Sequence, residues 1–204
     1  MDIDGIIGIE SFRKFSWQLD NIKKHLVVTK DAPSASTYQT CDGYEDMLNS
    51  MPKIWFKHDE IDNIAFLIDT RASHGSIADD FTDYLKNKSY LKLTNEQKAV
   101  DANGINSNHS NVISSGLIYN DMALGDIKLY ESTNKKYTIG MDFLSRFDRY
   151  AFIPSRMMFC YDAKSINKIN VSPVRNIAIR YIDKHIEFFY NNDISDTQEL
   201  TVQL

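Results

Sequence analysis

An apolar segment that runs straight into an acidic residue is the feature that most constrains the fold of this chain. Residues 64–68 are entirely apolar and are followed directly by Asp69 and Thr70. A second apolar-rich segment, residues 54–56, precedes them across the polar turn 59–63. Two short apolar runs around a polar turn predict a β-hairpin. The carboxylate of Asp69 is therefore expected at a strand-to-loop junction, although a plain strand end is the simpler alternative.

The residues after this junction predict a short amphipathic helix near residues 77–86. Ser76 is placed to cap it, with Asp79 three positions later as in a capping box. Three apolar residues then recur at a spacing of four, namely Ile77, Phe81 and Leu85. Further along, Asn103 and Gly104 are the residues of a type I′ hairpin turn.

The segment 65–73 resembles the catalytic Asp-Thr-Gly-Ala-Ser loop of the pepsin and retropepsin families of aspartic peptidases. It matches that loop at every position but one, because Arg71 stands where those families have glycine. A second segment, residues 138–147, is similar to the apolar-glycine strand and short helix that support the catalytic loop in these families. The resemblance covers roughly residues 52–162, in the order of one aspartic-peptidase lobe.

The resemblance implies a mostly β fold: a closed β-barrel lobe of the acid-protease (pepsin/retropepsin-like) type, with short helices near residues 77–86 and 141–147. Asp69 would be the catalytic residue of an active-site loop completed by Thr70, Arg71, Ala72 and Ser73. The supporting apolar-glycine loop would contain Ile139 and Gly140. No metal or cofactor is implied, because these peptidases activate a water with two carboxylates that share one proton.

An internal repeat bears on the domain organisation. Residues 7–15 align with residues 139–147 at a constant offset, since 139 minus 7 and 147 minus 15 both equal 132. An alternating apolar pattern follows over residues 17–28, interrupted at residues 21–24, and predicts a hairpin. Such repeats indicate duplicated architecture.

We therefore divide the chain into four parts. Residues 1–28 are interpreted as the closing segment of a preceding, largely missing lobe, and residues 29–51 as an interlobe connector. Residues 52–165 form the lobe that carries Asp69. Residues 166–204 form a C-terminal extension, with a β-hairpin over 177–190 and a polar tail that could be disordered.

Asp69 is only half of a catalytic pair, so the second aspartate must come from outside this chain. It would come from another lobe of the same full-length chain or from a second copy in a homodimer, and the homodimer leaves the repeat unexplained. The expected function is the C-terminal lobe of an aspartic endopeptidase that acts on a peptide or protein substrate.

Arg71 favours a different class of function. Glycine at this position lets backbone groups approach the carboxylate and the substrate, and arginine adds bulk and charge. A guanidinium that reaches Asp69 favours its ionised form and opposes proton sharing. The alternative is an inactive pseudo-peptidase that binds peptides or acts as a scaffold. Arg71 could also bind an acidic substrate side chain, or be a solvated loop residue.

The composition limits the classes of molecule that this chain is expected to bind. The net charge is -5 without a long basic block, which argues against nucleic acid. No apolar run approaches the ~18 residues of a membrane span. Cys41 and Cys160 fit no metal spacing, and a disulfide between them is conceivable if the protein is exported. Cys160 aligns with Val28 in the repeat and is interpreted as a buried strand residue. A secreted or periplasmic location is favoured only by the family resemblance.

Overall fold

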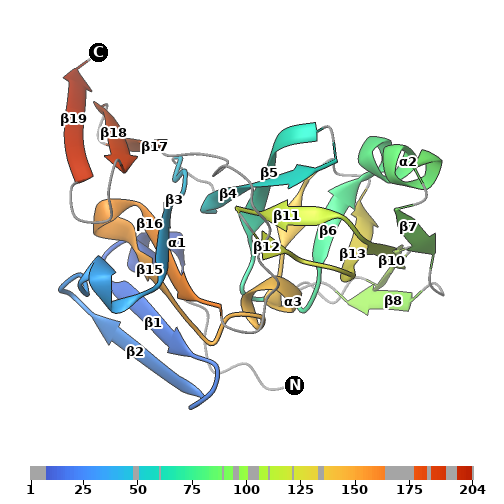
Figure 1. The fold of residues 1–204 in the computed structure, drawn as a ribbon, viewed down its shortest axis with the longest axis horizontal. Coiled ribbons are helices and arrows are strands. Elements are labelled where there is room, and N and C mark those ends of the chain that lie inside the picture. Colours follow the sequence, from blue (N-terminus) through green and yellow to red (C-terminus); the bar gives the residue numbers. More distant parts are fainter. Residues whose placement is uncertain are drawn as a thin grey trace. The chain divides into compact units, whose positions relative to one another are not determined.

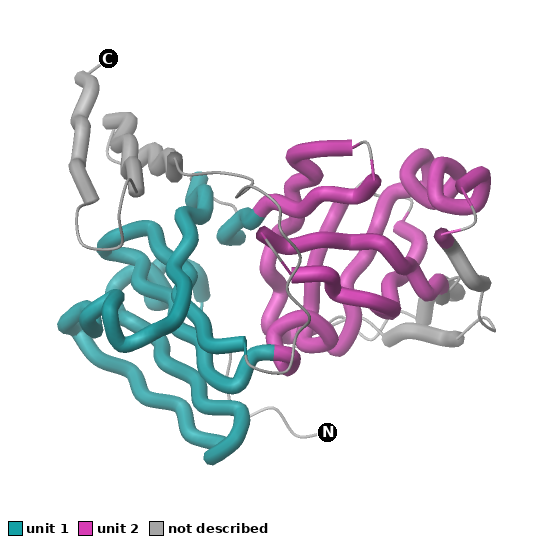
Figure 2. Tube along the Cα trace, in the orientation of Figure 1, with its two compact units in different colours: residues 1–54, 147–165, 175–204 teal, residues 55–146, 166–174 magenta. Residues whose placement is uncertain are grey.

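The computed structural model describes residues 8–47, 51–59, 61–88, 90–93, 97–100, 106–109, 111–120, 122–132, 136–163, 177–182, 185–191 and 197–203. The chain is mostly β with short helices, as the sequence predicts (Figure 1). It divides into two compact units (Figure 2). The first comprises residues 1–54, 147–165 and 175–204, and the second comprises residues 55–146 and 166–174. None of the described helices is long and apolar enough to cross a membrane.

The first unit contains a five-stranded antiparallel sheet in the order β2-β1-β15-β16-β3. Its strands are β1 (Ser16–Asp20), β2 (His25–Thr29), β3 (Thr40–Gly43), β15 (Arg149–Ile153) and β16 (Met158–Asp162). Short helical turns accompany them: α1 (Ile9–Phe12), η1 (Ala35–Thr37) and η2 (Pro154–Arg156). The hairpin predicted around residues 21–24 is confirmed as β1 and β2.

The sequence repeat is also a repeat of secondary structure. Helix α1 and helix α3 (Met141–Leu144) are offset by 141 minus 9, or 132 residues. Strands β1 and β2 are offset from β15 and β16 by 133 residues, since 149 minus 16 and 158 minus 25 give the same value. The second copy therefore has one extra residue between helix and hairpin, and Cys160 corresponds to Val27 rather than to Val28.

The two copies of the hairpin meet through equivalent strands. Strand β1 pairs antiparallel with β15, and Gln18 faces Ala151. These two residues are themselves equivalent, because 151 minus 18 is 133. Antiparallel pairing of equivalent residues is the arrangement that a local twofold axis produces. The sheet is therefore built from two related halves.

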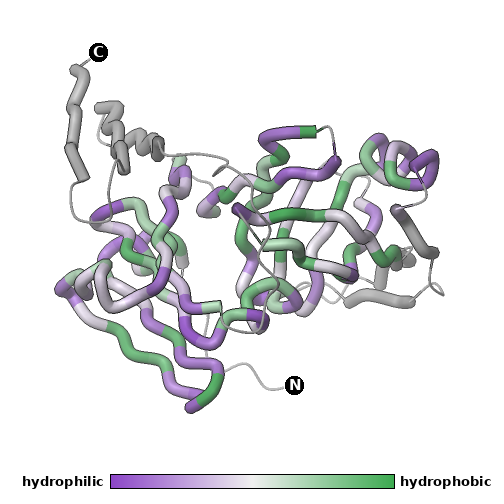
Figure 3. Tube along the Cα trace, viewed as in Figure 1, coloured by the Kyte–Doolittle hydropathy of each residue, from purple (hydrophilic) through white to green (hydrophobic). Residues whose placement is uncertain are grey.

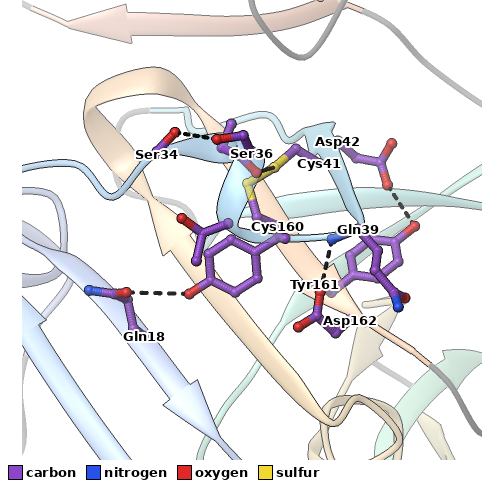
Figure 4. The surroundings of a disulfide bond; sticks show 12 residues. Gln18, Ser34, Ser36, Gln39, Cys41, Asp42, Cys160, Tyr161 and Asp162 are labelled. Carbon is purple, nitrogen blue, oxygen red and sulfur yellow. Dashed lines mark hydrogen bonds between the residues drawn. A yellow bond between two sulfur atoms is a disulfide. The ribbon is translucent and has the colours of Figure 1, made fainter.

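Each face of this sheet has a packed layer. Five aromatic side chains form one connected cluster of ring contacts: Phe147, Tyr150, Phe152, Phe159 and Tyr161. A second cluster contains Cys41, Ala151 and Cys160. Cys41 and Cys160 face each other in the β3–β16 pair and form a disulfide (Figure 4). The interval 29–51 is thus more than a connector, because Thr40–Gly43 completes the sheet.

The second unit contains a nine-stranded sheet in the order β12-β11-β4-β5-β14-β6-β13-β10-β7. This sheet is curled into a half-barrel. Its strands are β4 (Lys53–His58), β5 (Ile61–Ile68), β6 (Gly75–Ala78), β7 (Leu91–Leu93), β10 (Asn111–Ser114), β11 (Leu117–Tyr119), β12 (Met122–Ala123), β13 (Ile127–Ser132) and β14 (Thr138–Ile139). The unit also contains α2 (Asp79–Asn87), α3, and the separate pair β8 (Gln97–Val100) and β9 (Asn106–His109). The Asn103–Gly104 turn lies outside the described residues.

The hairpin predicted before Asp69 is confirmed as β4 and β5. The helix predicted near residues 141–147 is confirmed as α3. The helix predicted near residues 77–86 is confirmed as α2, but its capping box is wrong, since the N-cap is Ala78. Ser76 lies instead in β6, where its hydroxyl bonds to the hydroxyl of Thr138 at 2.9 Å. Strand β14 pairs with β6 at Ser76, and pairing with β13 extends β6 by two residues beyond Ser76.

Two features differ from the proposed division of the chain. Strands β15 and β16, which the sequence analysis placed in the lobe of residues 52–165, pair with β1 and β3 in the sheet of the first unit. The C-terminal hairpin is confirmed as β17 (Ile177–Ile182) and β18 (His185–Asn191). Within the predicted polar tail, residues 197–203 form a strand, because β19 (Thr197–Gln203) pairs with β18 along its whole length.

Candidate active site

The loop that carries Asp69 is held at both ends by one short strand. Strand β14 runs parallel to β5, which leads into the loop, and antiparallel to β6, which leaves it. The backbone N–H of Asp69 donates to the carbonyl of Ile139 at 2.9 Å, and that of Leu67 donates to Tyr137 at 3.0 Å. The position of Asp69 is therefore set by backbone hydrogen bonds to β14.

Two glycines allow the close approach of these backbones. A Cβ atom on Gly75 would lie 2.1 Å from the carbonyl oxygen of Thr138, and one on Gly140 would lie 2.5 Å from that of Ala72. Both contacts are with backbone, so a side chain cannot be accommodated by a rotamer change. The sequence analysis identified Gly140 and missed Gly75. The available signal was a glycine within a strand, which often marks close approach of another backbone.

The far side of the loop is tied to the start of α3. The N–H of Met141 donates to the carbonyl of Ala72, and the N–H of Asp142 donates to that of Ser73, both at 2.9 Å. The structure thus brings together the active-site loop and the apolar-glycine segment predicted from sequence. Thr70 and Ser73 are exposed, whereas Ile139 and Gly140 are buried.

The carboxylate of Asp69 is engaged by Arg71. Its Oδ1 atom accepts hydrogen bonds from the backbone N–H of Arg71 at 3.0 Å and from Nε at 3.2 Å, and Oδ2 accepts one from Nη2 at 3.4 Å. The Asp69 side chain is 18% exposed and that of Arg71 is 65% exposed. An ion pair this open to solvent stabilises the fold by about 0–1 kcal/mol, so another charged group can displace it.

The backbone at position 71 does not require glycine. Arg71 is not among the described residues with positive φ, which are Lys24, Asp59, Asn63, Asn120 and Met157. Arginine therefore adopts this loop conformation without backbone strain. What it adds to the loop is side-chain bulk and a positive charge beside Asp69.

A histidine–carboxylate contact lies next to the loop and was not predicted. The Nδ1 atom of His74 lies 3.1 Å from Oδ2 of Asp142, without the alignment of a hydrogen bond. The same Oδ2 accepts the backbone N–H of Lys128 at 3.2 Å. The His74 ring also packs against Tyr130, with centroids 5.6 Å apart.

In the described part of the chain, no three His, Cys, Asp or Glu side chains cluster as they would around a metal ion. Among the same residues, Arg71 is the side chain that bonds to the Asp69 carboxylate. Comparison with protein families, curated proteins and solved structures returns no match to this chain. The loop and its surroundings are therefore the basis for a function.

Proposed function

We propose that this chain is the C-terminal lobe of an aspartic endopeptidase, with Asp69 as one of its two catalytic carboxylates. The observation that carries the proposal is the insertion of β14 between β5 and β6, with Asp69 N–H bonded to the Ile139 carbonyl. This arrangement presents a partly exposed carboxylate on a loop fastened at both ends. Preorganisation of this kind is what a residue in a catalytic pair needs.

The proposed chemistry needs two carboxylates and a water. One carboxylate is ionised and removes a proton from the water as it attacks the scissile carbonyl carbon. The other is protonated and donates a hydrogen bond to the carbonyl oxygen. Like charges a few ångströms apart cannot both ionise, so the pair shares one proton. Asp69 supplies one member, and the other comes from a second lobe.

The repeat supports a second lobe in the same full-length chain. The segment that fastens the Asp69 loop, β14, is followed by α3, β15 and β16. Helix α1, β1 and β2 have the same order, with one residue fewer between helix and hairpin, and β1 pairs with its counterpart β15 through equivalent residues. These elements are thus the closing part of a lobe whose own catalytic loop would lie outside this chain. A homodimer is the other source of a second aspartate.

The Asp69–Arg71 ion pair favours a second candidate, a pseudo-peptidase that binds peptides without cleaving them. The guanidinium contacts both oxygens of the carboxylate and would oppose proton sharing with a partner aspartate. Since three of its five N–H groups are not used by Asp69, it could also bind an acidic side chain of the peptide.

Substitutions at position 71 separate these candidates. The protein is tested in a form that can supply both carboxylates: the full-length polypeptide, and the concentrated chain for a homodimer. If the charge of Arg71 suppresses catalysis, Arg71→Gly should cleave a mixed peptide library at acidic pH about tenfold faster or more. Arg71→Gln, which removes the charge but keeps most of the bulk, should show the same gain, and Asp69→Ala should abolish it.

The other outcomes are equally informative. A gain in Arg71→Gly alone would assign the effect to bulk. Faster cleavage by the unmodified protein beside acidic residues would make Arg71 a specificity element. Absence of cleavage by every variant, with retained peptide binding, would refute the peptidase and leave the binding module.

A further inference from the structure

One buried nitrogen of the His74 side chain faces a carboxylate beside the Asp69 loop. The Nδ1 atom of His74 is buried and has no hydrogen-bond partner in the described structure. Oδ2 of Asp142 lies 3.1 Å from it, although the His74 side chain as a whole is 25% exposed. Buried polar atoms in folded proteins nearly always have a partner, so this contact requires a physical explanation.

The proton state of Nδ1 follows from the atom that it faces. An ionised carboxylate only accepts hydrogen bonds, whereas a neutral imidazole has one donating and one accepting nitrogen. If Nδ1 were the accepting nitrogen, two lone pairs would lie 3.1 Å apart and Nδ1 would be shielded from water, which is unfavourable. A proton on Nδ1 makes the same contact attractive. A rotation about χ2, which is broad for histidine, is sufficient to align the N–H with Oδ2.

Asp142 connects three parts of the second unit. Its backbone N–H donates to the carbonyl of Ser73 in the loop at 2.9 Å, and its Oδ2 accepts the N–H of Lys128 in β13 at 3.2 Å. Hydrophobic and hydrophilic residues are mixed along α3 (Figure 3), where Phe143 and Leu144 are buried and the Asp142 side chain is 30% exposed. The Asp142 carboxylate is therefore held in place next to the end of the loop.

We propose that His74 is a positioning residue of the Asp69 loop, whose Nδ1–H donates a hydrogen bond to Oδ2 of Asp142. This bond adds a side-chain link to the two backbone bonds that tie Ala72 and Ser73 to the start of α3. It therefore limits how far the loop can move away from α3. The inference rests on the proposed function only for the catalytic role of Asp69.

Two substitutions at position 74 separate the donor from the ring. His74→Phe removes the nitrogen but keeps an aromatic ring to pack against Tyr130, as His74 does at a centroid distance of 5.6 Å. His74→Asn removes the ring but keeps a donor, because the amide nitrogen of asparagine is attached to Cγ as Nδ1 is. If the hydrogen bond to Asp142 positions the loop, asparagine should replace histidine and phenylalanine should not.

Amide hydrogen exchange measures how firmly the loop is fastened. The N–H groups of Met141 and Asp142 donate to loop carbonyls, so they exchange when the loop leaves α3. His74→Phe should speed their exchange about tenfold, as expected for the loss of a hydrogen bond to a charged group, and His74→Asn should stay close to the unmodified rate. The N–H of Leu124, bonded to the Leu117 carbonyl at 2.9 Å, is the control and should exchange at an unchanged rate.

Asp142→Asn tests the acceptor, since it removes the negative charge and keeps an oxygen for the Lys128 N–H. Exchange of the Met141 amide should rise as in His74→Phe, and the double variant should exchange no faster than His74→Phe alone, because both changes remove the same bond. Nitrogen NMR of the unmodified chain should show a proton on Nδ1 of His74. None of these measurements requires peptide cleavage, so their outcome is separate from that of the proposed function.

Several results would refute the proposal. An Nδ1 atom without a proton would remove the donor. If His74→Phe left the exchange of the Met141 amide unchanged, ring packing would be sufficient and the bond would have no positioning role. Equal acceleration in His74→Asn and His74→Phe would show that the donor is not what fastens the loop. Additive effects of His74→Phe and Asp142→Asn would show that the two side chains act independently.

Discussion

At the scale of single residues, the candidate site depends on where a side chain is absent. Gly140 and Gly75 bring three backbone segments within contact distance, and this contact positions Asp69 against Ile139. Arg71 has the opposite role, because it adds a side chain without altering the backbone conformation. The loop therefore combines a tightly constrained backbone with an exposed charged group.

The steric role of Gly140 predicts a loss of stability on substitution. In Gly140→Ala the new Cβ would lie 2.5 Å from the Ala72 carbonyl oxygen and 2.9 Å from the carbonyl carbon of His74. Overpacking of this kind costs about 1–3 kcal/mol in the free energy of unfolding, measured by urea denaturation. Gly8→Ala is the control, since Gly8 is the helix N-cap equivalent to Gly140 and a Cβ there meets nothing within 4 Å. If both variants lost the same free energy of unfolding, the loss would come from the N-cap position and not from steric crowding.

A buried tyrosine predicts the response to alkaline pH. Burial raises the pKa of Tyr150 to about 12, from its ordinary value of 10.0. Between these values the unfolded chain loses the proton and the folded chain keeps it, so stability is fully present below pH 10 and falls as the pH rises through the folded pKa. Tyr150→Phe should reduce this fall in urea titrations at several pH values.

The Tyr150 hydroxyl is buried without a hydrogen-bond partner in the described structure. Tyr150→Phe should therefore be neutral or stabilising at pH 7. Tyr137→Phe is the comparison, because the pKa of Tyr137 is also raised to about 12, by burial and by Asp80. Its hydroxyl donates to Asp80 at 3.2 Å, so this variant should lose about 1 kcal/mol at neutral pH. If the stability of Tyr150→Phe fell with rising alkaline pH as steeply as that of the unmodified chain, the fall could not be assigned to the Tyr150 hydroxyl.

At the scale of elements, the organising feature is the repeated helix and hairpin. Strands β1 and β15 pair through equivalent residues, which joins segments far apart in the chain at the centre of one sheet. Strand β3 then closes one side of that sheet, and the Cys41–Cys160 disulfide fastens it to β16. The bond spans 119 residues of sequence.

Loss of this disulfide should destabilise the first unit. Closing a long loop reduces the entropy of the unfolded chain, and such bonds typically contribute about 2–4 kcal/mol. Reduction, or the double substitution Cys41→Ala and Cys160→Ala, should lower the urea midpoint by a corresponding amount. Trp17 lies in the first unit, so its fluorescence in a Trp55→Phe background reports this unfolding. A midpoint unaffected by reducing agent would contradict the prediction.

At the scale of the whole molecule, the two units differ in which parts of the sequence supply their strands. All nine strands of the second unit's sheet come from residues 53–139. The five-stranded sheet of the first unit combines residues 16–43 with residues 149–162, which lie on either side of the second unit's strands in the sequence. One unit can therefore form from a continuous stretch of sequence, whereas the other needs distant segments to meet.

A fragment of residues 53–146 should thus fold by itself. Its aromatic core is internal, since Phe56 contacts Phe66, Tyr119 and Phe143. We expect cooperative urea unfolding reported by Trp55, which is the sole tryptophan of the fragment. Fragments 8–47 and 147–163 should be unfolded when separate, because each lacks strands that complete the sheet. An unfolded 53–146 fragment would show that the second unit depends on the rest of the chain.

The sequence by itself determined the local elements around Asp69. Short apolar runs separated by polar turns specify the β4–β5 and β1–β2 hairpins, because alternation and turn residues act over a few positions. The resemblance of residues 65–73 and 138–147 to peptidase segments also identified two loops that the structure brings into contact. Local pattern was sufficient for the hairpins because the interactions that form them are local, whereas the contact between the two loops was implied by the family resemblance.

Tertiary structure decided the features that depend on pairing between distant strands. Ser76 has the sequence of a helix cap, but pairing with β13 and β14 holds it in a strand. The polar tail forms β19 because β18 offers it an open edge. The pairing of Cys160 with Cys41 and the position of β15 beside β1 likewise follow from which distant segments meet in space. Strand pairing satisfies backbone hydrogen bonds regardless of sequence distance, and local composition does not encode it.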